Sequence, residues 1–485
     1  MKNSDYDIIF IHPPRNLEYL SSNIKTRSSY IMMPMGLFGM ADLLDREGFN
    51  VKIINYPLEI HLDPDFSIIK YLAKLNPKIV GVDLHWVLHS AGSIDILKLI
   101  KNQFPKCFTL LGGYTATYYA QEILNTYGFI DGIIQGDAEK PIISLLNNLH
   151  SLEQVPNLIY RNKGNIYDNR ISYVAEDIDD LNFAKVHFLD HWQEYIKYNY
   201  EIMHTPWPVE MARGCPFNCI NCGGGRYSSK TINRRKNVIF RSPSRVVDDI
   251  KDLMEKSKIK GVFYGHGVYP GTEKYFMEIH ELLRKENLDL HADLEIWRLP
   301  VSKEFLLDFA KTYDLEKSMI WFSVRSFSET YRNKFDNLYG RLDTSFDVSN
   351  EELENLMALA NKFQIPLRFF WDVGNPHETG IDLLKSFLYS IKLLITQSSS
   401  HSKVSFWSEP IIISPGCLNE MYSEFFGIET ESNNFKDYIE MNRTSKMRFP
   451  PIDVSVNYKT NYLSKIGINL MNKINAFVNL ISVIT

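Results

Sequence analysis

Three cysteines lie close together in one short stretch and are the residues best suited to chemistry. Cys215, Cys219 and Cys222 fall within eight residues, although the chain has only five cysteines, and three glycines follow them at 223–225. Thiols this close together cannot all pair as disulfides, whereas one turn of chain can direct all three at a single metal ion or cluster. The spacing therefore predicts a metal centre at 215–222.

Three thiols leave one position of such a centre without a protein ligand. Cys107 and Cys417 lie far away in the sequence, and no second Cys-x-x-Cys motif or His pair offers a matching fourth ligand. An open position is typical of a reactive centre, because structural zinc sites are closed by four ligands. An iron–sulfur cluster held by closely spaced cysteines fits this pattern. The alternative is a zinc knuckle that a distant histidine completes.

The composition is that of a globular protein with more than one domain. A chain of 485 residues is long enough for two or three domains, and its hydrophobic fraction is 45%. A formal charge of −5 provides no general basic field, so we expect no nucleic-acid partner. The N-terminus has no apolar signal segment, and the apolar C-terminal residues include lysines. We therefore expect a cytoplasmic protein without an integral membrane span.

Strands and helices alternate through residues 1–150, which predicts a doubly wound, Rossmann-like parallel sheet. The predicted strands are 7–11, 51–54, 79–82, 109–111 and 132–134, and the predicted helices are 34–48, 66–75, 93–102 and 120–127. Ligands of such sheets bind at the carboxyl ends of the strands, so the candidate loops are 84–86, 112–114 and 136–139. Gly112 and Gly113 permit a bulky ligand to approach the backbone closely.

Residues 151–205 are predicted to be a connector, with a hairpin signal at Asn162-Lys163-Gly164-Asn165. A second βα series over 206–415 predicts a partial (β/α)6 barrel related to the triose-isomerase barrel, whose site lies at the carboxyl ends of its strands. The predicted strands are 209–211, 261–264, 288–296, 319–324, 367–373 and 404–407, and the predicted helices are 244–256, 272–286, 303–311, 350–362 and 381–395. The cysteine loop follows the first strand, so it lies at the barrel mouth.

Residues 416–485 are expected to be mainly helical. Apolar residues step by three and four near the end of the chain, at Leu463, Ile466, Leu470, Ile474, Phe477, Ile481 and Ile484. Such a stripe predicts a helix docked on the barrel. The alternatives are a dimer seam or a helix on a membrane surface, because Lys465 and Lys473 flank the stripe.

The Cys-x3-Cys-x2-Cys motif, on the first loop of a six-fold βα series, resembles the radical S-adenosylmethionine (SAM) superfamily. The resemblance implies that Cys215, Cys219 and Cys222 hold a 4Fe-4S cluster, which binds SAM at its open iron and cleaves it to a 5'-deoxyadenosyl radical. This chain departs from the family at Asn221, where an aromatic residue often precedes the third cysteine. The resemblance assigns no catalytic residue, and it implies SAM contacts at Phe217, Asn221, Gly265, His266, Gly267, Glu295, Ser323, Arg325 and Gly374.

The N-terminal region resembles the cobalamin-binding domain of one large branch of this superfamily. The resemblance implies cobalamin contacts at Pro34, Met35, Gly36, Leu84, His85, Trp86, Gly112, Gly113, Tyr114, Gly136, Asp137 and Glu139. The Asp-x-His-x-x-Gly signature of histidine-ligated cobalamin is absent. We therefore expect base-off cobalamin without a histidine ligand, with His85 or Trp86 facing its lower side. The alternative is the same fold without a cofactor, because a fold alone does not fix function.

Cobalamin beside a radical cluster implies, within this branch, a methyltransferase that methylates an unactivated carbon of a small-molecule or peptide-derived substrate. An external one-electron reductant of the flavodoxin or ferredoxin type is implied as a partner. One alternative is a cobalamin-dependent radical enzyme that closes or rearranges a ring, or oxidises its substrate, without methyl transfer. A binding protein, such as a zinc-knuckle module or a corrinoid carrier, is the alternative from another class.

Overall fold

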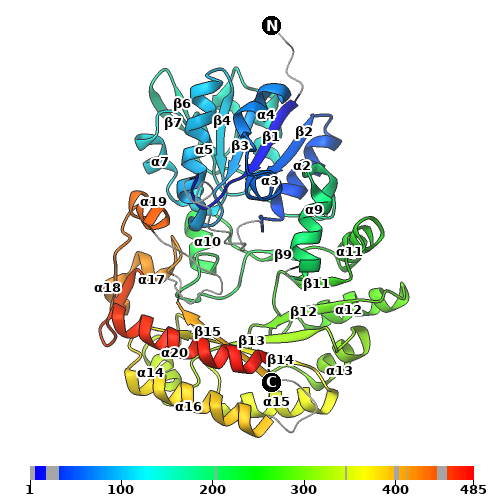
Figure 1. Ribbon diagram of the computed structural model, residues 1–485, viewed down its shortest axis with the longest axis vertical. Coiled ribbons are helices and arrows are strands. Elements are labelled where there is room, and N and C mark those ends of the chain that lie inside the picture. The colour runs from blue at the N-terminus through cyan, green and yellow to red at the C-terminus, as the bar shows by residue number, and fades with distance from the viewer. Residues whose placement is uncertain are drawn as a thin grey trace. The chain divides into compact units, whose positions relative to one another are not determined.

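The chain forms two compact units, each built on its own parallel sheet. The structure is a computed structural model that describes residues 6–17, 32–202, 205–343, 347–397, 404–411, 413–444 and 456–484 (Figure 1). Unit 1 comprises Met1–Met203, Tyr227–Ile239 and Ser432–Phe449. Unit 2 comprises His204–Arg226, Phe240–Glu431 and Pro450–Thr485. The division at 1–150, 151–205, 206–415 and 416–485 stays a prediction, and the two compact units group these segments differently.

Unit 1 contains a seven-stranded sheet in the order β2-β1-β3-β4-β5-β6-β7. Its strands are β1 (Tyr6–His12), β2 (Val51–Asn55), β3 (Pro77–Asp83), β4 (Phe108–Gly112), β5 (Gly132–Ile134), β6 (Leu158–Asn162) and β7 (Asn165–Asp168). Pairing is parallel from β2 to β5, as their continuous apolar runs predict. The chain passes from β1 to β2 on one side and then crosses to β3 on the other. The carboxyl ends of β1 and β3 therefore mark the switch point at which doubly wound sheets bind ligands.

Helices cover this sheet, and two later segments complete unit 1. The helices are α2 (Gly36–Arg46), α3 (Tyr56–Leu62), α4 (Ile68–Leu75), α5 (Ser90–Gln103), α6 (Tyr114–Tyr118), α7 (Ala120–Thr126), α8 (Glu139–Asn147), α9 (Trp192–Ile196), α10 (Arg226–Ile232) and α19 (Phe435–Thr444). The hairpin predicted in the connector is β6–β7, which extends the sheet because β6 pairs antiparallel with β5. Helix α19 packs on α5, where the Asn442 amide donates to the Val87 carbonyl oxygen at 2.8 Å.

Unit 2 contains a six-stranded parallel sheet in the order β15-β14-β13-β12-β11-β8, which confirms the predicted partial barrel. Its strands are β8 (Trp207–Val209), β11 (Gly261–Tyr264), β12 (His291–Ile296), β13 (Met319–Arg325), β14 (Leu367–Val373) and β15 (Val404–Pro410). The short strands are β9 (Ala212–Arg213), β10 (Ile239–Phe240), β16 (Ile428–Thr430) and β17 (Tyr458–Thr460). The helices are α11 (Pro243–Ser257), α12 (Glu273–Lys285), α13 (Lys303–Thr312), α14 (Glu329–Tyr339), α15 (Asn350–Phe363), α16 (Gly380–Gln397), α17 (Leu418–Met421), α18 (Ser423–Phe426) and α20 (Lys465–Ile484).

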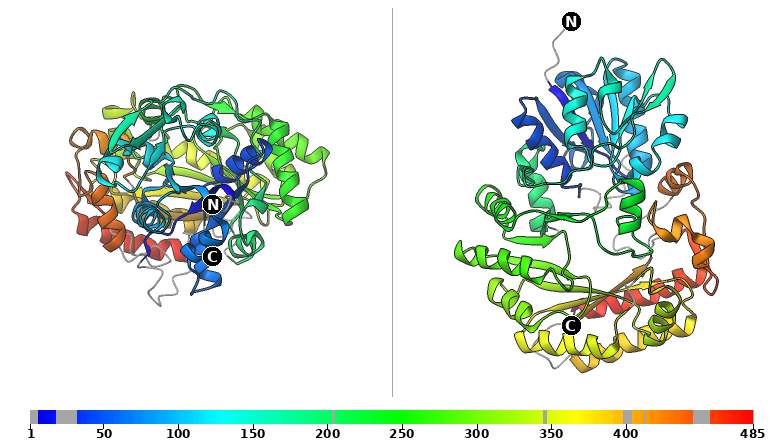
Figure 2. Two further views of the ribbon diagram at one scale, coloured as in Figure 1. Left: turned by 90° about the horizontal axis from the view of Figure 1, so that it is seen from above. Right: turned by 180° about the vertical axis from the view of Figure 1, so that it is seen from behind.

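The barrel strands alternate between two environments. Along β13, Ile320, Phe322 and Val324 are almost completely buried in the core shared with the outer helices, whereas the residues between them are only half-buried. Side chains alternate across a strand, so the half-buried set faces the barrel lumen. The green and yellow helices of unit 2 lie along the outer side of its sheet (Figure 2). Polar caps start several of them, such as the Ser349 and Glu352 capping box of α15.

The C-terminal helix docks on the barrel, and of its predicted apolar stripe the described part within the helix faces away from the barrel, whereas Leu463, which precedes the helix, is buried in the core. Helix α20 packs along β15, with Ile468 fully buried. Ile466, Leu470 and Ile474 of the stripe are instead exposed to solvent. The side chains of Phe477, Ile481 and Ile484 lie outside the described residues. Among the described ranges, no helix is long and apolar enough to cross a membrane.

Candidate active site

The cysteine loop folds back on itself directly after β9. Gly214 begins the loop at φ +96°, a left-handed conformation that strains any residue with a side chain. The Cys222 amide donates to the Cys219 carbonyl oxygen at 3.0 Å, and the Arg226 amide donates to the Phe217 carbonyl oxygen at 2.7 Å. Cys215 and Cys219 are half-buried, Cys222 is exposed, and all three are free thiols. The local sequence thus closes a compact turn that carries the three thiols.

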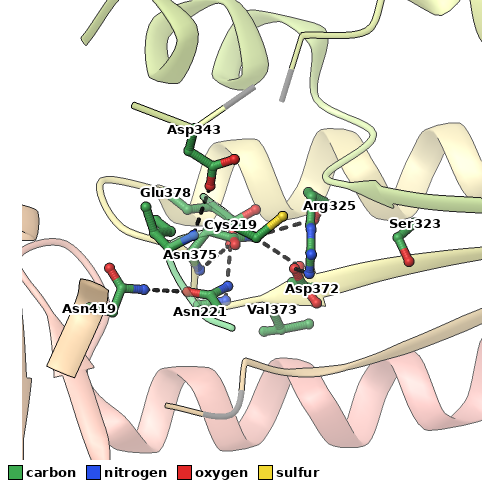
Figure 3. Close-up of polar contacts among 12 residues, drawn as sticks. Cys219, Asn221, Ser323, Arg325, Asp343, Asp372, Val373, Asn375, Glu378 and Asn419 are labelled. Atoms are coloured by element: carbon green, nitrogen blue, oxygen red, sulfur yellow. Dashed lines mark hydrogen bonds and ion pairs between the residues drawn. The ribbon is translucent and has the colours of Figure 1, made fainter. Parts of the chain in front are cut away.

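Two residues far away in the sequence hold this turn in place (Figure 3). The carboxylate of Asp343, which is buried, accepts the Ile220 amide hydrogen at 2.9 Å. Asn419, at the start of α17, donates its backbone amide to the Ile220 carbonyl oxygen at 3.0 Å, and its side chain donates to that of Asn221. Asn221 is therefore engaged in fixing the loop. The sequence alone gave no signal for Asp343 or Asn419, because their contacts are formed only in the folded barrel.

Arg298 brings a positive charge to the same loop. Its guanidinium lies 3.5 Å from the Cys219 sulfur and 4.1 Å from the centre of the Phe217 ring. The Phe217 ring in turn meets Tyr269 edge-on, with ring centres 5.1 Å apart. The cysteine motif did not predict Arg298, which follows β12 and reaches the loop across the barrel mouth.

The surroundings of the cysteine thiols suit a metal-binding site. Burial raises the pKa of the Cys215 thiol to about 12, and the neighbouring Cys219 and Cys222 raise it further. The Cys215 thiol therefore remains protonated until a metal centre replaces its proton and supplies compensating positive charge. The donor set of three sulfurs, with no fourth ligand in the motif, fits an iron–sulfur cluster with one open iron. These three cysteines would hold the cluster.

The predicted SAM contacts on β11 to β13 gather at the carboxyl ends of these strands. A side chain at Gly267 would overlap the Trp297 ring, so glycine is the residue that fits there. The neighbouring His266 is buried, which lowers the pKa of its imidazole to about 4 and keeps the ring neutral at pH 7. Glu295 accepts the Ser323 hydroxyl hydrogen at 2.8 Å and the Trp297 indole N–H at 3.0 Å. The structure brings this carboxylate and this hydroxyl together, as polar groups beside the cysteine loop.

The predicted contacts Arg325 and Gly374 belong to a second polar network at the ends of β13 and β14 (Figure 3). The Arg325 guanidinium pairs with the Asp372 carboxylate at 3.0 Å. Gly374 lies at φ +83°, and the buried Glu378 accepts the amide hydrogens of Gly374 and Asn375 at 3.0 and 3.1 Å. Burial raises the pKa of Glu378 to about 8. Glu378 thus caps the turn as a protonated carboxyl group at neutral pH.

The predicted cobalamin contacts lie in unit 1, on loops at the carboxyl ends of its parallel strands. Leu84, His85 and Trp86 follow β3, Gly112, Gly113 and Tyr114 end β4, and Gly136, Asp137 and Glu139 follow β5. Pro34, Met35 and Gly36 start α2.

The β3 and β4 loops touch at Gly113, whose φ is +109° and where a side chain would lie 2.7 Å from the His85 nitrogen. His85 and Trp86 are exposed to solvent, as a contact on a ligand face requires, and Leu84 is fully buried. The Asp137 carboxylate is already paired with Arg235 and accepts the Ala175 amide hydrogen at 2.8 Å. Asp137 therefore serves to hold its own loop.

A buried polar cluster lies below this edge, at the switch point of the sheet. His12 ends β1 and Asp83 ends β3, and the imidazole Nδ1 lies 2.9 Å from the carboxylate Oδ1. The His89 ring meets the His12 ring edge-on, with centres 4.7 Å apart. Burial lowers the pKa of His89 well below its usual value, so this ring is neutral. Neither His12 nor Asp83 was among the site residues that the sequence predicted.

Sequence comparisons agree with this arrangement. The family model described as "B12 binding domain" matches residues 23–146. The chain is 24% identical to a hopanoid C-3 methylase of Methylococcus capsulatus, over 54% of this chain and 47% of that protein. It is 25% identical to an uncharacterized methyltransferase of Pyrococcus horikoshii, over 53% of each chain. The chain thus spans about half the length of the curated relatives it matches.

The solved structures extend the likeness to almost the whole chain. The radical SAM methyltransferase TsrM from Kitasatospora setae, solved with tryptophan substrate and a SAM analogue, superposes with a TM-score of 0.64 at 13% identity, over 99% of this chain and 89% of that chain. The cobalamin-dependent radical SAM enzyme OxsB, solved with aqua-cobalamin, gives a TM-score of 0.60 at 16% identity, over 90% and 56%. The chain therefore contains a B12-binding domain and has the fold of the cobalamin-dependent radical SAM enzymes, as its sequence predicts.

Proposed function

We propose that this chain is a cobalamin-dependent radical SAM methyltransferase that methylates an unactivated carbon of a small-molecule or peptide-derived substrate. The observation that carries the proposal is the presence, in one chain, of three free thiols on the first loop of a parallel barrel and a separate B12-binding domain. The named relatives and the shared fold support the same reading. A barrel alone or a B12-binding domain alone would not support this proposal, because a fold does not fix function.

When bound, the cluster, SAM and cobalamin would supply a carbon-centred radical and a methyl group. The side chains of this protein would position these groups and keep water away from them. Cys215, Cys219 and Cys222 would hold the cluster, and Arg298 would offset the negative charge of its thiolates. Glu295 and Ser323 offer polar contacts for the nucleoside, and the guanidinium of Arg325, which is already paired with Asp372, would share its remaining donors with a carboxylate. SAM would be used both as methyl source and as radical source.

The lumen face of the barrel is where the substrate would bind. Half-buried aromatic residues project from it at Trp321, Phe370 and Trp407. Burial raises the pKa of Glu409, beside Trp407, to about 7, so this carboxyl group exchanges a proton near neutral pH. Asp372 is the register partner of Glu409 across β14 and β15. A substrate with both an apolar part and hydrogen-bonding groups suits this face.

The proposed chemistry also indicates a reductant for the cluster and a location for the protein. The cluster would need single electrons from outside, which a flavodoxin or ferredoxin would supply. Partly accessible thiols that must remain reduced also favour a cytoplasmic location.

The test is to follow the methyl group. Anaerobically reconstituted protein, supplied with reductant, cobalamin, SAM labelled in its methyl group and candidate substrates, should form labelled product with the mass gain of one methylene unit. Formation of 5'-deoxyadenosine without label in any product would contradict methyl transfer while leaving the radical chemistry intact.

A second candidate is a cyclase or oxidising enzyme that uses the same cofactors without transferring a methyl group. It is favoured by one observation: the chain is 26% identical to an anaerobic magnesium-protoporphyrin IX monomethyl ester cyclase of Rubrivivax gelatinosus, over 58% of this chain and 48% of that protein. The product mass decides between the two, because a cyclase product gains no methylene unit.

A further inference from the structure

Two histidines and one aspartate from separate segments meet inside unit 1. His12 ends β1, Asp83 ends β3, and His89 directly precedes α5. All three residues are buried, and none of them is more than 7% exposed. One nitrogen of each imidazole and one oxygen of the carboxylate lie within 4.8 Å of one another. We call these residues the His12–Asp83–His89 cluster.

The carboxylate of Asp83 has an oxygen that the protein leaves without a contact. Its Oδ1 lies 2.9 Å from the His12 Nδ1. Its Oδ2 is buried and has no hydrogen-bond partner among the described residues. A buried carboxylate oxygen without a partner is unfavourable, so an ion or a water molecule is expected to complete its contacts. Two imidazoles beside the same carboxylate favour an ion, because together they form a set of metal ligands.

Contacts outside the three side chains hold the backbone of the cluster in place. The Ser93 hydroxyl oxygen lies 3.0 Å from the Asp83 carbonyl oxygen and 2.8 Å from the His89 carbonyl oxygen, so it ties two of the three residues together. The Gly92 amide donates to the Arg15 carbonyl oxygen at 3.0 Å, which fixes the start of α5 against the segment after β1. Outer contacts of this kind orient metal ligands before the ion binds.

The donor set and its spacing suit a transition metal. Zn²⁺ binds imidazole nitrogen at about 2.0–2.1 Å and carboxylate oxygen at about 2.0–2.2 Å, so two ligand atoms of a tetrahedral ion lie roughly 3.4 Å apart. The 2.9 Å between His12 Nδ1 and Asp83 Oδ1 is close to that separation, and small side-chain rotations would bring in the third ligand. Ca²⁺ and Mg²⁺ suit the cluster less well, because they take oxygen ligands.

A positive side chain nearby does not exclude a cation. Arg15 is buried in the same region, and its guanidinium donates to the Asn442 side-chain oxygen at 3.1 Å. Zinc sites made of three neutral imidazoles keep the full charge of the ion, whereas the carboxylate of Asp83 offsets part of it here.

We propose that the His12–Asp83–His89 cluster binds a divalent transition-metal ion, with Zn²⁺ as the ion that its donors suit best. The ion would replace the proton that His12 Nδ1 and Asp83 Oδ1 share, and this proton would be released to solvent. The fourth position would be left to Asp83 Oδ2 or to a water molecule. The ion would join the ends of β1 and β3 to the start of α5. The Trp86 ring meets the His89 ring edge-on, with centres 5.8 Å apart, so the ion would also steady the loop predicted to contact cobalamin.

The test is zinc binding by tag-free, full-length protein in which Cys215, Cys219 and Cys222 are all replaced by Ser. Zinc cannot then bind to the thiols of the barrel, and the assay needs neither cobalamin nor SAM nor turnover. This triple Cys→Ser protein should retain one Zn²⁺ per chain after equilibrium dialysis. Co²⁺ in place of zinc should give the visible absorption of a metal bound by nitrogen and oxygen, without the charge-transfer band of a thiolate ligand.

Two variants of the triple Cys→Ser protein should weaken zinc binding to different extents. Asp83→Asn removes an anionic ligand and should lower the zinc affinity by about a hundredfold or more, because loss of an outer contact alone costs about 10- to 100-fold. Ser93→Ala keeps all three ligands and should lower it by roughly tenfold. Asp83→Asn keeps the size of its side chain, so circular dichroism should show a folded protein. Zinc should raise the unfolding temperature of the triple Cys→Ser protein but not that of Asp83→Asn.

Asp308→Asn in the same background is the matched control. The buried His280 forms a similar pair with Asp308, with Nδ1 and Oδ2 2.8 Å apart, but within the described part of the chain no third ligand completes a metal-binding group there. This variant should bind zinc like the triple Cys→Ser protein. A triple Cys→Ser protein that retains no zinc would overturn the proposal. Equal zinc affinity in Asp83→Asn would do so as well, because the ion would then be adventitious.

Discussion

Arg298 offers the sharpest test of the cluster assignment, because its effect is electrostatic and can be measured without turnover. A guanidinium 3.5 Å from the Cys219 sulfur favours the more negative, reduced form of a cluster bound there. Two unit charges roughly 6 Å apart, at an effective dielectric constant of roughly 20, interact by about 3 kcal/mol. For one electron, 59 mV corresponds to about 1.4 kcal/mol, so Arg298→Ala should lower the cluster midpoint potential by roughly 100 mV.

The assay is a redox titration of anaerobically reconstituted protein, followed by electron paramagnetic resonance. Iron and sulfide content should stay close to that of the original protein, because the three cysteines are unchanged. Arg298→Lys should fall between the two potentials, since it keeps the charge but loses the planar contact with the Phe217 ring.

Arg284→Ala is the matched control. Arg284 lies in the last turn of α12, before β12 begins, and therefore at the end of the barrel opposite the cysteine loop. This variant should leave the potential unchanged. A potential that does not fall in Arg298→Ala, with the cluster fully assembled, would refute the placement of the cluster at Cys219.

Three further predictions concern residues that hold the backbone in place at the barrel site and at the cobalamin site. The pKa of Glu378 is raised to about 8 in the folded protein, against an ordinary value of 4.5. Its contribution to stability is therefore present below about pH 5 and is lost as the pH rises towards 8, by up to about 1.4 kcal/mol per pH unit. Glu378→Gln should flatten the fall of thermal stability with pH, and parallel pH profiles of the two proteins would contradict this. Gly113→Ala should destabilise unit 1 by about 2 kcal/mol or more and weaken cobalamin binding, because the φ of Gly113 is +109° and backbone atoms block a side chain there. The control Gly128→Ala, at a position with open space around it, should change neither the stability nor cobalamin binding. Asp343→Ala should reduce the iron content after reconstitution because the Ile220 amide loses its acceptor, whereas Asp343→Asn, which keeps an oxygen acceptor, should retain most of it.

Local sequence patterns predicted the elements whose cause is local. Apolar runs such as 7–11 and 79–82 mark strands buried on both faces, and they pair in parallel as expected. The hairpin near residue 160 was also recognised, but not its place in the sheet, because a short polar hairpin does not specify which strand edge it joins. Helix α19 lies within residues 416–485, which were expected to be mainly helical, but nothing in its sequence shows that it returns to α5 of unit 1.

At the candidate active site, too, local sequence patterns were informative and contacts between distant segments were not predicted. The cysteine spacing alone indicated the metal centre, since one turn of chain presents all three thiols. Arg298, Asp343 and Asn419 reach the loop from distant segments, so only the fold reveals them. The apolar stripe of α20 was read correctly as a stripe, but periodicity does not say which side of a helix faces the protein.

The central claim is that one chain holds an iron–sulfur cluster in its barrel and cobalamin in its B12-binding domain. The most direct measurement is the iron, sulfide, zinc and cobalamin content of anaerobically reconstituted protein and of its Cys219→Ala variant. The original protein should contain iron, sulfide and cobalamin together, and the variant should lose iron and sulfide while it retains cobalamin. Zinc in place of iron and sulfide, or protein that binds no cobalamin, would contradict the claim.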